Sequence, residues 1–497
     1  MDYLLGIDVG TGGTRAVLVD RTGAIASSAT CEHEPFASPR TGWAEQDPHD
    51  WWRAAGSAIR AALTNLPDAN VVCAGLAGQM HGAVLLDEND EVLRPALIWC
   101  DQRTQAQCDW LNSKLGKRKI IELTCNPALT NFTLTKLLWV RDNEPELWKR
   151  FRRVLLPKDY VRFRISGEHA IDVAEASGTL MLDVAHRRWS EEMMSAAGLP
   201  MGSLPKVFES PDVCARISEV GAKHTGLKAG TPIVAGAGDQ AGGAVGMGIV
   251  RTGAVSATIG TSGVVFAATD NPAMDPQGRV HTFCHAVPGR WHVMGVTQAA
   301  GLSLRWIRDL LKNSGELSYD QLTREAAQVA SGSDGVLWAP YLMGERTPHL
   351  DPSARATLTG LAANHSRGHI ARAVLEGVAF SLKDTFSLFD EMKVPVRNVR
   401  LGGGGARSDL WRQIQADIYG YEVEILAAEE GAAYGAALLA GIDAKWWNSV
   451  EEACDAVVQV QQRVKADTTA AAAMKQQYEK YRQLYPALKP LFGKPAE

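Results

Sequence analysis

A turn near the start of the chain contains the residue types that bind phosphate. The segment DVGTGGTR, residues 8–15, follows an apolar run. Its consecutive small residues allow backbone N–H groups to converge on an anion, and a cation follows them. Asp8 is placed where a carboxylate meets a polyphosphate, mainly through Mg²⁺ or its water ligands. An ordinary hairpin turn, in which Gly and Thr are common, is the open alternative. The residues expected to line the cradle are Thr11, Gly12, Gly13 and Arg15.

Two further glycine-rich segments predict other parts of a nucleotide site. IGTSGV, residues 259–264, offers an opposing phosphate cradle from Gly260, Thr261 and Ser262. LGGGGARSDLWRQ, residues 401–413, has four glycines between an apolar strand and a helix, where a flat ring such as adenine can approach the backbone. A tight strand-to-helix turn is the alternative, although it needs only one or two glycines. The sequence contains neither GxxxxGK[ST] nor GxGxxG.

One isolated carboxylate, Asp239, lies among small residues in GAGDQAGG, residues 236–243. Phosphoryl transfer to an alcohol needs a group that accepts the hydroxyl proton, and a substrate has room beside this side chain. The same residue can instead be the N-cap of a helix over the following residues. The two roles are compatible.

Polar residues between apolar strands and beside aromatic rings are candidate sugar contacts. Met80 and His81 interrupt two apolar runs in AGQMHGAVLL. A neutral imidazole can hydrogen-bond a sugar hydroxyl, and Met can pack on the carbon face of the sugar, although a lone His is more often structural. Asp101 and Arg103, in IWCDQR, are two further polar groups next to an aromatic residue. Sugar rings stack on Trp, but most of the 14 tryptophans should be in the core or at interfaces.

The elements that position these residues form two halves that open alike. Residues 3–20 read as strand, Gly-Thr turn and strand, and residues 254–270 repeat this pattern 250 positions later. The glycine-rich residues 231–250 are expected at the join. Apolar runs at 71–76 and 83–86 indicate strands, and helical spacing follows a proline in 48–66. Further helices are expected over residues 367–388, 409–419 and 468–488.

Composition is typical of an ordinary globular protein of two large domains. The chain has 497 residues, 46% of them hydrophobic, and a net charge of −5. The scattered charges disfavour a nucleic-acid or membrane partner, and the N-terminus does not resemble a signal peptide, so a cytoplasmic location is expected. The eight cysteines contain no CxxC pair and are expected to be reduced thiols. His281 and His285 are expected to be structural, because the residues between them read as strand.

Together these segments resemble the FGGY carbohydrate kinases of the actin-like ATPase superfamily, over essentially the whole chain. KLLWVRDN, residues 136–143, resembles the first family signature, and residues 356–376 fit the second at every constrained position. Four other segments look like the xylulokinase subgroup: QMHG at 79–82, AEQDP at 44–48, LLPKDY at 155–160 and YLMGERTPH at 341–349.

The resemblance implies an α/β fold of two RNase H-like domains with a cleft between them. The N-terminal domain, residues 1–246, would contain the sugar site, the first phosphate hairpin and the catalytic aspartate. The C-terminal domain, residues 247–497, would contain the second hairpin and the adenine pocket. A homodimer is a possible assembly.

The resemblance also implies the reaction. Mg-ATP would donate its γ-phosphoryl group to a ketopentose hydroxyl, and by similarity to xylulokinases this hydroxyl would be O5 of D-xylulose. Asp239 would accept the proton, Asp8 would organise Mg²⁺ and phosphate, and Met80 and His81 would contact the sugar. The adenine pocket would be lined by Gly404, Gly405 and Ser408.

Two positions depart from the family pattern or vary within it. Asn131 stands where the first signature usually has an aromatic or small residue, and we expect no functional consequence. Gln240 occupies a position that varies between Asn and Gln among related sugar kinases, and it is a candidate substrate contact. Other acceptors therefore stay open, among them ribulose, glycerol and gluconate. A nucleotide-binding sensor without catalysis is a further alternative, which the carboxylate of Asp239 disfavours.

Overall fold

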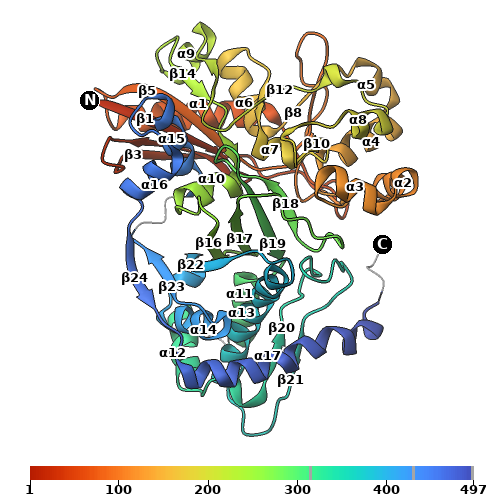
Figure 1. Cartoon of the computed structure of the whole chain (residues 1–497), viewed down its shortest axis with the longest axis vertical. Helices are drawn as coiled ribbons and strands as arrows, with labels where there is room; N and C mark the ends of the chain where they lie inside the picture. Colours follow the sequence, from red (N-terminus) through yellow and green to blue (C-terminus); the bar gives the residue numbers. More distant parts are fainter. Residues whose placement is uncertain (313–315, 428–430, 494–497) are drawn as a thin grey trace.

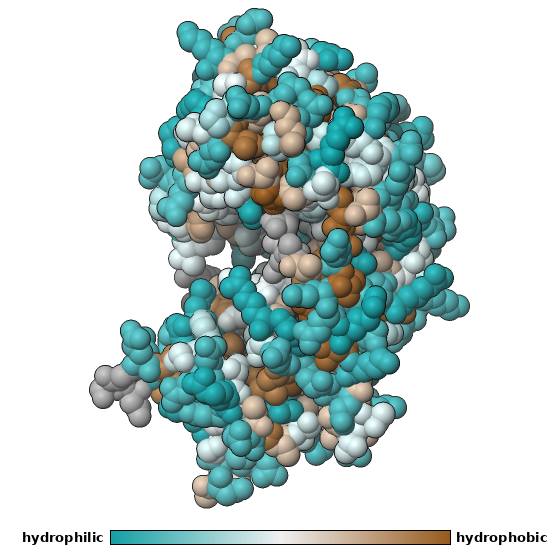
Figure 2. Space-filling view, turned by 90° about the vertical axis from the view of Figure 1, so that its left-hand side faces the viewer, coloured by the Kyte–Doolittle hydropathy of each residue, from teal (hydrophilic) through white to brown (hydrophobic). Residues whose placement is uncertain are grey.

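The chain folds into two lobes, each built on a seven-stranded sheet (Figure 1). The computed structural model describes residues 1–312, 316–427 and 431–493. The first sheet has the order β13-β14-β5-β1-β2-β3, with β15 also paired to β5. The second has the order β18-β19-β17-β16-β22-β23-β24. The molecule is hollowed at the waist between the lobes, as Figure 2 shows.

The first sheet confirms the hairpin predicted at the start of the chain. β1 (Asp2–Val9) pairs antiparallel with β2 (Gly13–Val19), which places Asp8 opposite Arg15. β1 also pairs in parallel with β5 (Asn70–Gly78), and its apolar side chains are buried. The other strands of this sheet are β3 (Ile25–Glu32), β13 (Val213–Arg216), β14 (Pro232–Val234) and β15 (Ala237–Gly238). The helices around it include α1 (Pro48–Thr64), α6 (Pro157–Ser166), α9 (Glu219–Thr225) and α10 (Asp239–Gly246).

The second sheet repeats this arrangement and so confirms the internal repeat. β16 (Gly253–Ile259) and β17 (Gly263–Thr269) form an antiparallel hairpin, and β16 pairs in parallel with β22 (Val396–Gly403), as β1 does with β5. The remaining strands are β18 (His281–Cys284), β19 (Trp291–Thr297), β23 (Val423–Leu426) and β24 (Val460–Val464), with the pair β20 (Leu337–Ala339) and β21 (Thr357–Thr359) outside the sheet.

Helices in the second lobe lie where the sequence predicts them. α13 (Arg367–Glu391) continues a little beyond its predicted end, whereas α14 (Asp409–Tyr419) and α17 (Thr468–Leu488) match the expected ranges. Ser408 and Asp467 cap the last two, each accepting a backbone N–H bond, which explains their sharp starts. α11 (Gly301–Leu311) and α12 (Tyr319–Ala327) complete this group.

An insertion of short elements extends the first lobe to one side (Figure 1). Its helices are α2 (Gln105–Leu115), α3 (Lys117–Thr124), α4 (Thr133–Asn143), α5 (Pro145–Arg150), α7 (Val173–Ser177) and α8 (Glu191–Ala197). Short strands connect these helices to the sheet region: β4 (Glu45–Gln46), β6 (Val84–Leu86), β7 (Ala96–Leu97), β8 (Arg153–Leu155), β9 (Ala170–Asp172), β10 (Leu182–Asp183), β11 (Arg188–Trp189) and β12 (Lys206–Phe208).

Two helices from late in the chain pack on the first sheet. α15 (Gly431–Asp443) and α16 (Val450–Val457) share a buried apolar cluster with β1, β2 and β5. α15 approaches so closely that a Cβ on Gly6 would overlap the carbonyl oxygen of Ala433. A Cβ on Gly435 would likewise overlap the carbonyl oxygen of Gly242 in α10. A domain boundary between residues 246 and 247 therefore separates segments that share one hydrophobic core.

All eight cysteines are free thiols. None of the described helices combines the length and the apolar character needed to cross a membrane.

Candidate active site

Two carboxylates lie at the same edge of the first sheet. Asp8 of β1 pairs with Ala77 of β5. Ala77 in turn pairs with Ala237 of β15, which is two residues before Asp239. Burial raises the pKa of Asp8 to about 7, the charge of Asp239 adds to this rise, and Arg15 opposes it. Burial also raises the pKa of Asp239 to about 6. Parallel pairing through β5 thus brings together two acidic groups far apart in the sequence.

The carboxylate of Asp239 does not cap a helix. Gly238 is the N-cap of α10 and Asp239 is its first residue. The Oδ1 atom accepts a hydrogen bond from the backbone N–H of Gln240 at 2.7 Å, and bonds from Gln240 partly offset the rise in the pKa of Asp239. The structural alternative for this residue, an N-cap, is therefore wrong.

Hydrogen bonds within the first glycine-rich turn and from neighbouring side chains fix its conformation. The N–H of Gly10 donates to the carbonyl of Gly13, which closes the turn. The indole N–H of Trp99 donates to the Thr11 hydroxyl at 2.9 Å, and Gln46 donates to the Thr11 carbonyl at 2.8 Å. Gly12 is exposed, and a Cβ there would meet nothing within 4 Å. The tip of the turn is accessible while its base is fixed.

The second turn and the glycine-rich segment line one cavity of about 450 Å³, a volume suited to a nucleoside. The predicted residues Gly260, Thr261, Gly404, Gly405 and Ser408 all line it. Ser262 is not among the lining residues, and neither are residues of the first turn. Sequence reasoning missed the opposite wall, which comes from α11, α12 and the start of α14: Gly301, Leu302, Arg305, Tyr319, Asp320, Thr323 and Trp411.

Glycines at this cavity are required by close backbone packing. Gly403 has φ +71°, and a Cβ on it would lie 2.5 Å from the carbonyl oxygen of Ile259. A Cβ on Gly405 would lie 2.7 Å from the Ile259 side chain. The segment after β22 therefore lies directly on the end of β16, and this brings the two glycine-rich motifs into one site.

His81 is held as a neutral hydrogen-bond acceptor. Its Nδ1 lies 2.6 Å from the carbonyl oxygen of Gly178, so Nδ1 carries the proton and Nε2 keeps its lone pair. Burial lowers the pKa of His81 to about 3. Its backbone has φ +69°, and Lys136 stabilises this conformation because its Nζ donates to the His81 carbonyl at 2.9 Å. The Lys of the first signature is thus a support for His81.

Met80, Asn131 and two residues of β18 surround this imidazole. Met80 is buried, and its side chain lies against Gly238, next to Asp239. Both polar atoms of the Asn131 side chain are buried and have no hydrogen-bond partner among the described residues. His281 and Phe283 of the second lobe contact Phe132, whose ring also lies edge-on to His81.

Asp101 and Arg103 form a buried ion pair with each other. Arg103 donates to both oxygens of Asp101 and to Glu45 at distances of 2.7 to 3.0 Å, and its guanidinium lies 3.6 Å from the ring centroid of Trp43. The two side chains are 0% and 1% exposed. The two charges thus neutralise each other inside the protein, and their assignment to substrate binding stays a prediction.

A buried charge network lies behind Asp239. Lys158 bridges Asp159 and Asp172 at 2.5 and 2.7 Å. Glu175 is fully buried, its oxygens have no hydrogen-bond partner among the described residues, and burial raises its pKa well above the usual range. One Glu175 oxygen lies against Gly238. Burial therefore favours the protonated form of this carboxyl, which lies beneath the loop that carries Asp239.

Two lobes with matching sheets and hairpins, and two buried carboxylates at the edge of the first sheet, are consistent with an actin-like ATPase fold. The chain belongs to the FGGY family of carbohydrate kinases, whose N-terminal domain matches residues 3–246 and whose C-terminal domain matches residues 255–444.

Several xylulose kinases resemble the chain over nearly its full length. A xylulose kinase of Escherichia coli is 39% identical over 98% of this chain and 100% of its own. A xylulose kinase of Bacillus subtilis is 37% identical over 99% and 97%. The crystal structure of xylulose kinase from Rhodospirillum rubrum superposes with a TM-score of 0.91 at 29% identity, covering 99% of each chain.

Proposed function

We propose that this chain transfers the γ-phosphoryl group of ATP to O5 of D-xylulose, forming D-xylulose 5-phosphate and ADP. The observation that carries the proposal is the position of Asp239. Its carboxylate has a pKa near 6, and the residue before it, Gly238, lies against the side chain of Met80, which precedes the neutral His81. The similarity to xylulose kinases over the full chain supports the choice of sugar.

Asp239 would act as the general base. The sugar hydroxyl gives its proton to the carboxylate as its oxygen attacks the γ-phosphorus, and the bond to the β,γ-bridging oxygen breaks to release ADP. A pKa near 6 keeps most of the carboxylate ionised at neutral pH and still allows it to accept a proton. Positioned general bases contribute about 10²–10⁴-fold to rate.

The sugar would be bound between the lobes by complementary groups. Nε2 of His81 accepts a hydrogen bond from a sugar hydroxyl, and Met80 packs on the carbon chain. The unpartnered amide of Asn131 can both donate and accept. Gln240, next to the base, contacts the end of the sugar that reacts.

The nucleotide would occupy the cavity of about 450 Å³ in the second lobe, with its adenine against Gly404 and Gly405 and near Ser408. Its phosphates would extend from Gly260, Thr261 and Ser262 toward the first turn, where Thr11, Gly12, Gly13 and Arg15 complete the cradle. Such convergent N–H groups bind anions without a P-loop lysine.

Mg²⁺ fits this arrangement next to Asp8. One oxygen of Asp8 is buried without a hydrogen-bond partner among the described residues, as expected for a carboxylate that meets a hydrated cation. When bound with the nucleotide, the ion would neutralise charge on the phosphates. We also propose a cytoplasmic location, since ATP is the donor; a homodimer stays a prediction.

The proposal is tested with purified protein in an ADP-release assay against D-xylulose, ribulose, glycerol and gluconate. D-Xylulose should give the highest kcat/KM. Asp239→Asn should lower kcat about 10²–10⁴-fold while ATP affinity stays within twofold, because Asn can hold the hydroxyl but cannot take its proton. A variant that keeps more than a third of the wild-type rate would show that Asp239 is not the base. Absence of turnover on every sugar would favour the sensor alternative.

A further inference from the structure

Arg346, in the loop after β20, has a guanidinium that lacks a protein partner. Its side chain makes no hydrogen bond or ion pair with residues 1–312, 316–427 or 431–493, although the residue is partly buried. Burial lowers the pKa of Arg346, and only the charge of Glu345 opposes this. The five N–H donors of this guanidinium are therefore available to acceptors on a ligand.

The loop places Arg346 beside the start of β18, the second-lobe strand whose Phe283 ring centroid lies 6.1 Å from that of the His81 ring. The neighbouring Thr347 donates its N–H to the carbonyl of Val296 at 3.0 Å and its hydroxyl to the carbonyl of Arg279 at 2.9 Å. Val296 is two residues from Met294, which pairs with His281, and Arg279 is two residues before His281. Arg346 is therefore adjacent in the fold to the start of β18.

Electrostatics agrees with this location. Burial is the main cause of the low pKa values of His81 and His281, and the charge of Arg346 lowers both further. Arg346 does not contribute to the pKa shift of either Asp8 or Asp239. The guanidinium is thus near the imidazole end of the pocket rather than near the acidic pair.

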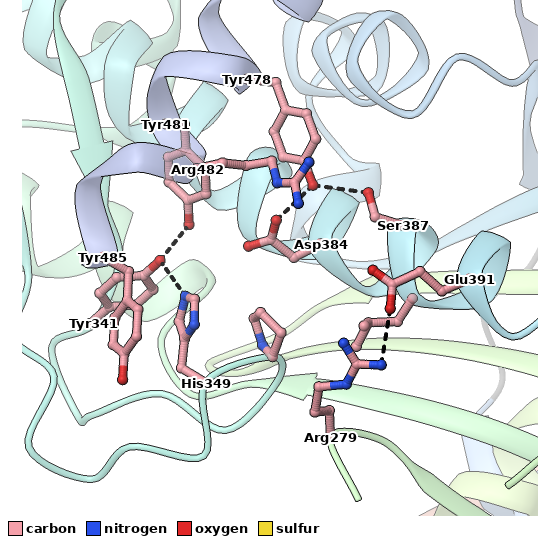
Figure 3. A pocket seen from close by; sticks show the side chains of 12 residues that line it. Arg279, Tyr341, His349, Asp384, Ser387, Glu391, Tyr478, Tyr481, Arg482 and Tyr485 are labelled. Carbon is pink, nitrogen blue, oxygen red and sulfur yellow. Dashed lines mark hydrogen bonds and ion pairs between the residues drawn. The ribbon is translucent and has the colours of Figure 1, made fainter. Parts of the chain in front are cut away.

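Both ends of this loop are firmly anchored. Glu345 accepts hydrogen bonds from the Thr297 hydroxyl at 2.6 Å and from the backbone N–H of Gln298 at 3.0 Å. At the other end, the cavity in Figure 3 holds His349, whose ring stacks on Tyr485 with centroids 3.6 Å apart. The hydroxyl of Tyr485 also donates to Asp351 at 2.7 Å. Arg346 is therefore presented on a preorganised support rather than a free loop.

We propose that Arg346 is a substrate-binding residue, contributed by the second lobe, that donates hydrogen bonds to the oxygens of the sugar farthest from the accepting hydroxyl. For a 2-ketose these are the C2 carbonyl and the C1 hydroxyl. A guanidinium only donates and a carbonyl only accepts, so the pair is complementary, whereas Nε2 of His81 requires a hydroxyl donor. This inference rests on the proposed function for the identity of the sugar.

The test compares Arg346→Met with Arg355→Met, an exposed arginine nearby in the same chain segment. Arg346→Met should raise the KM for D-xylulose at least tenfold, with the KM for ATP within twofold of wild type and a smaller effect on kcat. Arg355→Met should change none of these. Calorimetric titration of Arg346→Met with D-xylulose alone should show the same loss of affinity. The affinity for xylitol, which lacks the carbonyl, should fall less.

Two measurements separate loss of binding from loss of structure. Arg346→Lys should recover part of the sugar affinity, and millimolar guanidinium ion should partly rescue Arg346→Ala. An unchanged KM for D-xylulose, or an equal rise in the KM for ATP, overturns the proposal. If wild type prefers another sugar, the proposed function fails on that result, and the variants are measured with the preferred sugar to judge Arg346 separately.

Discussion

At the scale of single residues, the site combines groups whose ionisation is set by burial. His81 is neutral because its environment disfavours the imidazolium, and its Nδ1 proton is committed to the Gly178 carbonyl. The pKa of Asp239 is raised to about 6, which is still below neutral pH. An acceptor imidazole and a weakly basic carboxylate thus coexist in one pocket, each with a separate hydroxyl to bind.

The raised pKa of Asp239 predicts the acid limb of the pH profile. In wild type, log kcat/KM should fall with unit slope below pH about 6, because the protonated carboxyl cannot accept the hydroxyl proton. The residual activity of Asp239→Asn should lack this limb. An acid limb centred near pH 4 instead would show that the base has an ordinary carboxyl pKa.

The same shift predicts how stability varies with pH. A carboxyl whose pKa is higher in the folded state stabilises the fold at low pH, and this contribution is lost as the pH rises through about 6. Asp239→Asn avoids the ionised form, so its melting temperature should exceed that of wild type by a few degrees at pH 8. The difference should disappear at pH 4. Thermal unfolding at both pH values measures this, and a constant difference would contradict it.

At the scale of elements, helices α10 and α15 depend on glycine at their contact. Gly435→Ala should destabilise the protein by about 1–3 kcal/mol, because the added methyl overlaps the Gly242 carbonyl. Gly243 is the matched control: it lies in α10, and a Cβ there meets nothing within 4 Å. Gly243→Ala should be neutral or stabilise by about 0.5–1 kcal/mol through helix propensity. Urea unfolding compares the two, and equal losses would refute a contact effect.

Some elements of the fold could be predicted from the sequence, whereas contacts between distant residues could not. The two hairpins, α14 and α17 follow from local turn chemistry, apolar spacing and caps, which act within a few residues. The surroundings that the sequence could not predict depend on distant partners. Arg103 is neutralised by Asp101 and Glu45, and nothing local in IWCDQR reveals the third member. The position of His281 likewise depends on the pairing of β18 with β19, which the local sequence does not reveal.

At the scale of the whole molecule, the cavity that we propose for the nucleotide is lined, among the described residues, by the second lobe alone. The first phosphate turn can therefore reach the same ATP only if the lobes approach each other, which would also exclude water from the γ-phosphate. Sugar and nucleotide together should reduce the radius of gyration more than either alone. Small-angle scattering on Asp239→Asn measures this without turnover. The same radius in every liganded state would indicate a preformed site.

The packing of α15 and α16 on the first sheet has a consequence for synthesis on the ribosome. All strands of that sheet have been made by residue 238, but the helices that complete its core end only at residue 457. At a translation rate of about 5–20 residues per second, one apolar face of the nascent sheet stays uncovered for roughly 10 to 40 seconds. Exposed apolar surface promotes aggregation during this interval, so faster translation of residues 239–457, or a chaperone that covers the exposed face, should raise the yield.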